Sequence, residues 1–190
     1  MGVDIIFETH AMTTDDEAGR ATGWLPGELS ADGRRWARQL GERRRGDGLN
    51  VIFCSDLDRA VATVELAFLG VRIPVHRDTR LRECDFGDLN GAPLTEVLSR
   101  QAEHLDQPFP NGQGFRQVVD QAYGFLCDLA GAWDGRRVLV VAHPTNRWAL
   151  EHLINGRPLT DPVAAPEHRP EGWAYALPSG WAGQRADDGG

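Results

Sequence analysis

The stretch Val138-Leu139-Val140-Val141-Ala142 is the most strand-like run of this 190-residue chain, and His143 follows it directly. Five consecutive apolar residues are typical of a central strand that is buried on both faces of a sheet. Shorter apolar runs lie earlier in the chain, at 3–7 and 51–54. Together these runs predict the core of a largely parallel sheet.

Helical patterns separate the apolar runs. Ser30 and Ser55 are candidate N-caps of two helices that stop at Gly46 and near Gly70. Three more helices are expected to begin at Pro93, at about 115 and at about 145. Short strands are expected at 73–75 and 173–177, and segments 10–27 and 78–92 resemble loops. This alternation predicts one α/β domain over residues 1–178, with a disordered tail from 179 to 190.

Composition sets limits on the class of protein. Hydrophobic residues make up 41% of the chain and charged residues 25%, as in an ordinary soluble globular protein. No apolar run reaches the ~20 residues that cross a bilayer, and Asp4 and Glu8 interrupt the N-terminal apolar stretch. The three cysteines are widely spaced, which favours neither disulfides nor zinc. We therefore expect a cytoplasmic protein with no membrane partner, no metal and no cofactor.

The charge pattern restricts the partners. A net charge of −8 argues against binding to nucleic acid and requires any anion pocket to be locally basic. All 20 basic residues are arginine, whose planar guanidinium suits phosphate. The sequence gives no information on oligomeric state.

Chemically useful side chains follow three of the expected strands. Ligands of such sheets bind beyond the carboxyl ends of the strands, where the chain places Thr9, His10, the segment 55–59 and His143. An imidazole can attack phosphorus, and that chemistry also needs cationic donors and an acid. His10 is the candidate nucleophile. Arg59, Glu83 and His143 would supply the other groups.

Cys54 invites comparison with another group that attacks phosphorus, the cysteine in the Cys-x5-Arg loop of protein tyrosine phosphatases. Only four residues separate Cys54 from Arg59, and Asp56 and Asp58 would repel a phosphate. We reject this reading.

Seven short stretches occur in the order found in the histidine phosphatase superfamily, and the chain resembles that superfamily from about residue 3 to residue 155. They are Ile5-Ile6-Phe7-Glu8-Thr9-His10, Gly23-Trp24-Leu25, Leu29-Ser30-Ala31-Asp32-Gly33, Ser55-Asp56-Leu57-Asp58-Arg59-Ala60, Leu81-Arg82-Glu83, Asp85-Phe86-Gly87 and 138–143. The resemblance implies a three-layer α/β/α sandwich around a mostly parallel sheet with one antiparallel strand.

The resemblance also implies roles for residues. His10 would be the phosphorylated nucleophile and Glu83 the proton donor and later the base. Arg59 and His143 would hold the phosphoryl oxygens. Arg20 and Thr22 fall where relatives often contact substrate. The implied activity is metal-independent hydrolysis of a phosphorylated small molecule.

Three positions depart from the superfamily pattern. Thr9 stands where an arginine usually precedes the nucleophile, Ala11 where a glycine usually follows it, and Pro144 where a glycine usually follows the second histidine. We retain Thr9 and Pro144 as substrate-contacting positions. Arg147 is our first candidate to replace the missing guanidinium, and Arg82 is the second.

Two other functions stay open at this stage. The departures at Thr9 and Pro144 suggest a binding or regulatory protein whose catalytic site has weakened. A phosphomutase is ranked lower. Mutases of the superfamily usually carry longer insertions around the loop that bears the acid, whereas the segment from Glu83 to Leu94 is short. Within the site, Asp85 could compete with Glu83 for the role of the acid.

Overall fold

A five-stranded sheet forms the centre of the computed structural model, which describes residues 1–163 and 171–182. The strands are β1 (Val3–Thr9), β2 (Val51–Cys54), β3 (Val75–Arg77), β4 (Arg137–Ala142) and β5 (Trp173–Leu177), in the order β3-β2-β4-β1-β5. β5 runs antiparallel to β1, and the other neighbours are parallel. The predicted α/β class, with a mostly parallel sheet, is confirmed.

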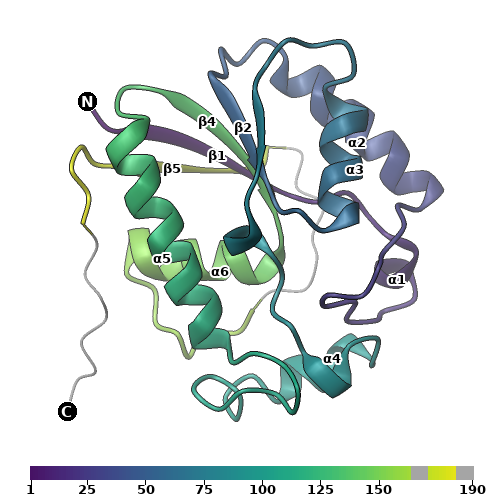
Figure 1. Cartoon of the computed structure of the whole chain (residues 1–190). Coiled ribbons are helices and arrows are strands. Elements are labelled where there is room, and N and C mark those ends of the chain that lie inside the picture. Colours follow the sequence, from purple (N-terminus) through teal and green to yellow (C-terminus); the bar gives the residue numbers. More distant parts are fainter. Residues whose placement is uncertain (164–170, 183–190) are drawn as a thin grey trace.

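Helices cover both faces of this sheet (Figure 1). They are α1 (Thr14–Glu17), α2 (Ala31–Arg44), α3 (Asp58–Ala67), α4 (Leu94–Ser99), α5 (Phe115–Ala132) and α6 (Pro144–Asn155), with short 3-10 turns at Thr79–Leu81 and Gly87–Leu89. α2 and α3 lie on one side of the sheet and α5 and α6 on the other, while α1 and α4 lie together at one end (Figure 1). The result is the three-layer sandwich that the resemblance implied.

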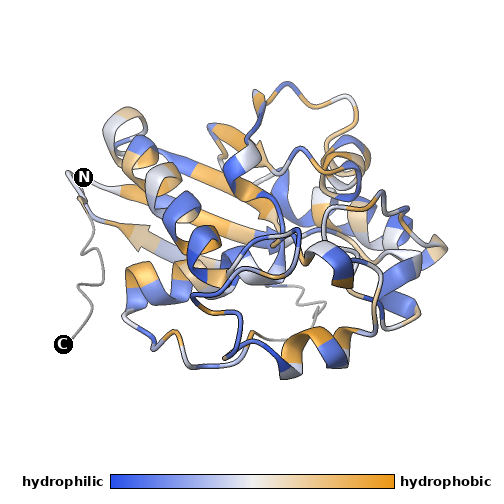
Figure 2. Cartoon of the chain, turned by 60° about the horizontal axis from the view of Figure 1, so that its bottom comes forward, coloured by the Kyte–Doolittle hydropathy of each residue, from blue (hydrophilic) through white to orange (hydrophobic). Residues whose placement is uncertain are grey.

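The apolar run of β4 is continuous because both of its faces are covered. Val138 and Val140 belong to the core beneath α5 and α6, whereas Leu139 and Val141 belong to the core beneath α2 and α3. All four side chains are fully buried. Figure 2 shows the same pattern, with apolar strands between helices whose outer faces are polar.

Several element boundaries differ from the sequence predictions. Ser30 caps α2 as expected, but the N-cap of α3 is Leu57, because the Ser55 hydroxyl accepts the Leu57 N–H (3.2 Å) in the turn before the helix. The strand predicted at 73–75 begins at Val75, after Pro74, which has no N–H to donate to a ladder. Segment 10–27 contains α1, and segment 78–92 contains both 3-10 turns.

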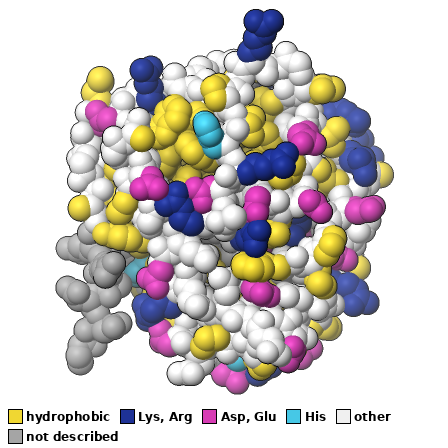
Figure 3. All heavy atoms as spheres, in the orientation of Figure 1, with side chains coloured by type: hydrophobic (Ala, Val, Ile, Leu, Met, Phe, Trp, Pro, Cys, Tyr) yellow, Lys and Arg dark blue, Asp and Glu magenta, His cyan; other side chains and the backbone are white. Residues whose placement is uncertain are grey.

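The described ranges contain no helix with the length and apolarity that crossing a bilayer requires. On the face displayed in Figure 3, arginines and acidic side chains alternate rather than forming a broad field of one sign. Of the tail expected from 179 to 190, residues 183–190 lie outside the described part of the chain. Trp181 packs against Tyr123 of α5, with ring centroids 5.7 Å apart.

Candidate active site

The two central parallel strands bring His10 and His143 together. β1 and β4 are neighbours in register, Thr9 beside Ala142, and the His10 N–H extends the ladder by donating to the Ala142 carbonyl (2.9 Å). Each histidine is the next residue of its strand, so the two rings meet at the same edge with centroids 5.0 Å apart. Both side chains are buried. Topology therefore creates a pair of imidazoles at the carboxyl end of the sheet.

A backbone contact selects the reactive nitrogen of His10. Nδ1 lies 2.9 Å from the carbonyl oxygen of Ala11, and a carbonyl can only accept, so Nδ1 carries the hydrogen. The lone pair is then on Nε2. Burial, followed by the nearby charge of Arg59, lowers the pKa of His10 to about 4. The ring is therefore neutral at pH 7 and available as a nucleophile.

Both ring nitrogens of His143 are buried, and neither has a hydrogen-bond partner within the described residues. Burial, with smaller contributions from the Arg59 and His10 charges, holds the pKa of His143 well below its usual range. Because unsatisfied buried polar groups are costly, such a ring indicates a place where a ligand completes the hydrogen bonding.

Arg59 offers a second unsatisfied donor. It lies in the first turn of α3, is 2% exposed, and donates from Nη2 to the Gly23 carbonyl (2.8 Å). Its Nη1 is buried without a partner in the described ranges. A guanidinium with a spare N–H in a buried site is suited to an anionic oxygen.

Glu83 is buried in the same pocket as His10 and Arg59. The Thr145 hydroxyl and the Cys84 N–H (2.8 Å) both donate to its Oε1, and the Trp24 indole donates to its backbone carbonyl (2.7 Å). Burial raises the pKa of Glu83, against the opposing effect of these hydrogen bonds and of Arg59. A raised carboxyl pKa favours the protonated form, which a general acid needs.

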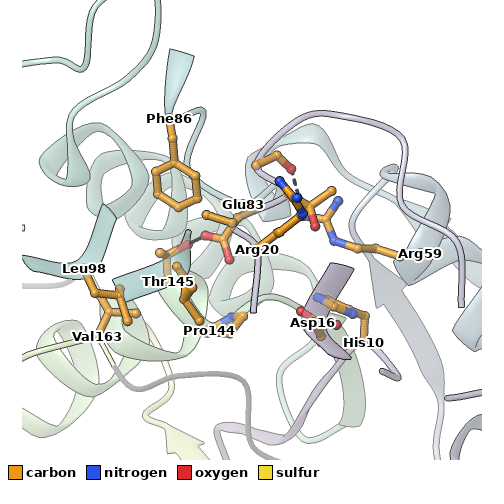
Figure 4. A pocket seen from close by; sticks show the side chains of 14 residues that line it. His10, Asp16, Arg20, Arg59, Glu83, Phe86, Leu98, Pro144, Thr145 and Val163 are labelled. Atoms are coloured by element: carbon orange, nitrogen blue, oxygen red, sulfur yellow. Dashed lines mark hydrogen bonds between the residues drawn. The ribbon is translucent and has the colours of Figure 1, made fainter. Parts of the chain in front are cut away.

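One pocket joins most of the predicted site residues (Figure 4). Its lining includes His10, Arg20, Thr22, Arg59, Glu83 and Pro144, and His143 packs against His10 beside it. The rest of the lining was not among the predicted site residues; it consists of Asp16, Ala21, Gly23, Phe86, Leu94, Leu98, Thr145 and Val163. Asp85, the rival of Glu83, is not part of this lining.

The structure does not bring Arg82, Arg147 or Thr9 into the pocket lining. Arg82 forms two hydrogen bonds with Asp56 (2.7 and 2.5 Å) and lies 4.6 Å from the Trp24 ring centroid. Arg147 lies 4.6 Å over the Trp173 ring and lines a different hollow. Neither arginine therefore compensates for Thr9 in this conformation.

Asp16 is a residue of the pocket lining that could have been found from the sequence. Its carboxylate accepts the backbone N–H (2.8 Å) and the hydroxyl (2.7 Å) of Thr13, which completes a capping box at the start of α1. The spacing of Thr13 and Asp16 is a known sign of such a cap. The cap turns the chain back after His10 and places an acid in the pocket.

No group of three or more His, Cys, Asp or Glu side chains within 1–163 and 171–182 is arranged to hold a metal ion. The donors around the pocket are instead the imidazoles of His10 and His143 and the guanidinium groups of Arg20 and Arg59. Such groups bind anions through N–H donors.

Comparisons with known proteins agree on one family. The family described as histidine phosphatase superfamily (branch 1) matches residues 5–166. A relative named uncharacterized phosphatase PhoE, from Bacillus subtilis, is 32% identical over 128 residues, which cover 67% of this chain and 65% of that protein, slightly less than two thirds of its length. A probable phosphoglycerate mutase GpmB from Salmonella is 30% identical over 157 residues, or 78% of this chain and 73% of the relative. Among solved structures, YhfR of Bacillus stearothermophilus superposes with a TM-score of 0.75 at 26% identity, covering 87% of this chain and 86% of that one.

Proposed function

The chain belongs to the histidine phosphatase superfamily, and we propose that it hydrolyses phosphate monoesters of small molecules through a phosphohistidine on His10. The observation that carries this proposal is the meeting of a neutral imidazole, two unsatisfied buried donor groups and a buried carboxyl with a raised pKa around one pocket. The phosphatase name of one relative supports the same reaction type.

In the first step, Nε2 of His10 forms a bond to phosphorus while the bond between phosphorus and the ester oxygen breaks. Glu83 gives its proton to the departing oxygen, so the alcohol leaves as a neutral molecule. Arg59 Nη1 and the His143 ring bind the phosphoryl oxygens, where negative charge is held in the transition state.

In the second step, water replaces the alcohol. Glu83, now a carboxylate, takes a proton from the water, the new oxygen–phosphorus bond forms, and the bond from phosphorus to Nε2 breaks. Phosphate leaves, and both His10 and Glu83 return to their starting states. All the donors to the phosphoryl oxygens in this scheme come from the chain, so the reaction as written uses no metal ion.

Labelling tests the proposal directly. A substrate with a labelled phosphoryl group should leave acid-labile, base-stable label on the wild-type protein and none on His10→Ala. We expect turnover of His10→Ala to fall by about 10³-fold or more, as for other lost nucleophiles. The exposed His76 provides the control, because His76→Ala should keep both label and turnover. Equal hydrolysis by wild type and His10→Ala would overturn the assignment.

Asp16 in the pocket, and the absence of Arg82 and Arg147 from it, favour a second candidate, a binding protein with a weakened site. Turnover of a simple phosphate ester above the His10→Ala level excludes it. The reaction products distinguish a mutase from a phosphatase. It would give an isomerised phosphate ester, whereas the proposed phosphatase releases inorganic phosphate.

A further inference from the structure

The pocket has two chemically different ends, with Glu83 between them (Figure 4). His10 and Arg59 lie at one end, and Phe86, Leu98 and Val163 at the other. In the reaction proposed above, the phosphoryl group occupies the first end and Glu83 protonates the leaving oxygen. The alcohol must therefore extend past Glu83 toward the second end.

The second end is an apolar wall, formed by Phe86, Leu94, Leu98 and Val163. Leu94 and Leu98 lie one turn apart on α4 and therefore share a face of the helix. Phe86 is 3% exposed and Val163 is 4% exposed. A leaving group placed here meets hydrocarbon from three separate segments of the chain.

Contacts behind the wall hold it in place. The Phe86 ring packs against those of Phe109 and Phe115, with centroids 5.5 and 6.2 Å away. The Val163 N–H donates to the Gln101 carboxamide (2.7 Å), which in turn donates to the Asp161 carbonyl (3.0 Å). The Val163 N–H and the Gln101 carboxamide are thus bonded within the protein and are not directed at a ligand.

The charges of the pocket disfavour a second anionic group on the substrate. The lining contains two arginines, Arg20 and Arg59, and two acids, Asp16 and Glu83. Whether or not Glu83 carries a proton, a bound phosphoryl dianion outweighs the positive charge that the two arginines leave after Asp16 is counted. Arg20 also donates from Nη1 to the Gly91 carbonyl (3.0 Å). A carboxylate or second phosphate would enter an environment that is already negative.

Given the hydrolase function above, we propose that the substrates are phosphate monoesters of apolar, uncharged alcohols and that Leu94 and Leu98 determine this specificity. The apolar wall binds the hydrocarbon part of the alcohol, and the phosphoryl end binds the group that all such esters share. Discrimination by an apolar pocket is worth roughly 10- to 200-fold in kcat/KM.

Substrates with matched leaving groups test the proposal. Benzyl and hexyl phosphate are compared with glycerol phosphate and 3-phosphoglycerate, which are all esters of alkyl alcohols and so differ little in intrinsic reactivity. We expect kcat/KM for the two apolar esters to exceed that of the polar ones by about 10-fold or more. Equal or faster hydrolysis of glycerol phosphate or 3-phosphoglycerate would overturn the specificity.

A variant of α4 should change the preference. Leu98→Arg places a cation on the apolar wall, so the ratio of kcat/KM for benzyl phosphate to that for 3-phosphoglycerate should fall by about 10-fold or more. Because both substrates are measured on one preparation, the ratio does not depend on the fraction of folded protein. Leu69→Arg, at a leucine that is 77% exposed and outside the pocket lining, should leave the ratio unchanged. An unchanged ratio in Leu98→Arg would contradict the role of the wall.

The two proposals fail in different ways. If labelled phosphate appears on His10 but the polar esters are preferred, the phosphatase function stands and the apolar specificity is wrong. If no ester in the panel labels His10 or releases phosphate, the phosphatase function itself is wrong.

Discussion

At the scale of single residues, the site depends on two opposite pKa shifts in one pocket. Burial lowers the pKa of the His10 imidazole to about 4 and raises the pKa of the Glu83 carboxyl. The same low-polarity surroundings therefore favour the uncharged form of both groups, one as a base and one as an acid. These are the protonation states that the proposed first step requires.

The dependence of kcat/KM on pH and on the leaving group should show whether Glu83 is the general acid. Since Glu83 acts when protonated, kcat/KM should fall as pH rises through its raised pKa, and Glu83→Gln should lose that limb. For alkyl phosphates, whose oxygen needs a proton, Glu83→Gln should be slower by about 10²- to 10⁴-fold. For 4-nitrophenyl phosphate, whose leaving group is stable as an anion, the loss should be much smaller.

Asp85→Asn is the matched comparison for this experiment, because Asp85 lies two residues away and outside the pocket lining. It should keep the alkaline limb and the wild-type dependence on leaving group. Similar losses of kcat/KM, which reports the first step alone, for both esters in Glu83→Gln would show that Glu83 does not protonate the leaving oxygen.

At the scale of elements, α3 positions both Arg59 and the backbone after His10. The Thr63 hydroxyl donates to the Arg59 carbonyl (2.7 Å) and accepts the Ala11 N–H (2.9 Å). α3 is in turn set by its contact with α2, where a side chain at Gly41 would overlap the carbonyl of Ala67. The close approach of the two helices therefore fixes the relation between the nucleophile and its guanidinium.

Gly41→Ala should disturb this contact. Alanine is normally the better helix former by about 1 kcal/mol, yet here we expect the free energy of unfolding to fall by about 1–3 kcal/mol, because α2 and α3 must separate. Urea denaturation measures the loss. Gly131→Ala in α5 is the control, since a methyl group there meets nothing within 4 Å, and it should be neutral or stabilising. A stabilising Gly41→Ala would refute the close contact.

The sequence predicted the elements better than their contacts. The continuous apolar run of β4 and the Ser30 cap are local signals, and both were read correctly. The close approach at Gly41 depends on where α3 packs and leaves no local pattern. The prediction that Ser55 is the N-cap of a helix was wrong, because a serine hydroxyl can accept an N–H from a turn as well as from a helix.

At the scale of the whole molecule, the catalytic candidates were predictable because topology gathers strand ends. Thr9 and Ala142 are partners in register, so the two following histidines meet wherever β1 and β4 pair. The partners of Arg82 and Arg147 could not be predicted in this way. Asp56 is 26 residues from Arg82, and Trp173 belongs to a strand whose position beside β1 is known only from the fold. A long side chain can contact residues that are distant in the sequence, and only the folded structure shows which ones.

A buried ion pair links distant parts of the chain beneath the site. Glu8 on β1 is 4% exposed and accepts hydrogen bonds from Nε (2.9 Å) and Nη2 (2.7 Å) of Arg44, at the end of α2. The same guanidinium donates to the Glu171 carbonyl (2.6 Å), just before β5. Burial raises the pKa of Glu8 despite this partner. The pair thus joins β1, α2 and the start of β5.

Removing Arg44 should lower the free energy of unfolding, by an amount that depends on pH. Arg44→Met leaves Glu8 buried without its main partner, so we expect the free energy of unfolding to fall by about 3 kcal/mol near pH 7. Because the folded-state pKa of Glu8 is raised, folding favours its protonated form, and stability falls as pH rises from 4.5 through that pKa. Arg44 opposes this rise, so removing it raises the pKa of Glu8 further, and the loss in Arg44→Met should be smaller at pH 5 than at pH 8. Glu8→Gln combined with Arg44→Met should recover part of it, whereas Arg38→Met, at an exposed arginine of the same helix, should cost little. Equal losses in the Arg44 and Arg38 variants would mean that the pair does not join the three segments energetically.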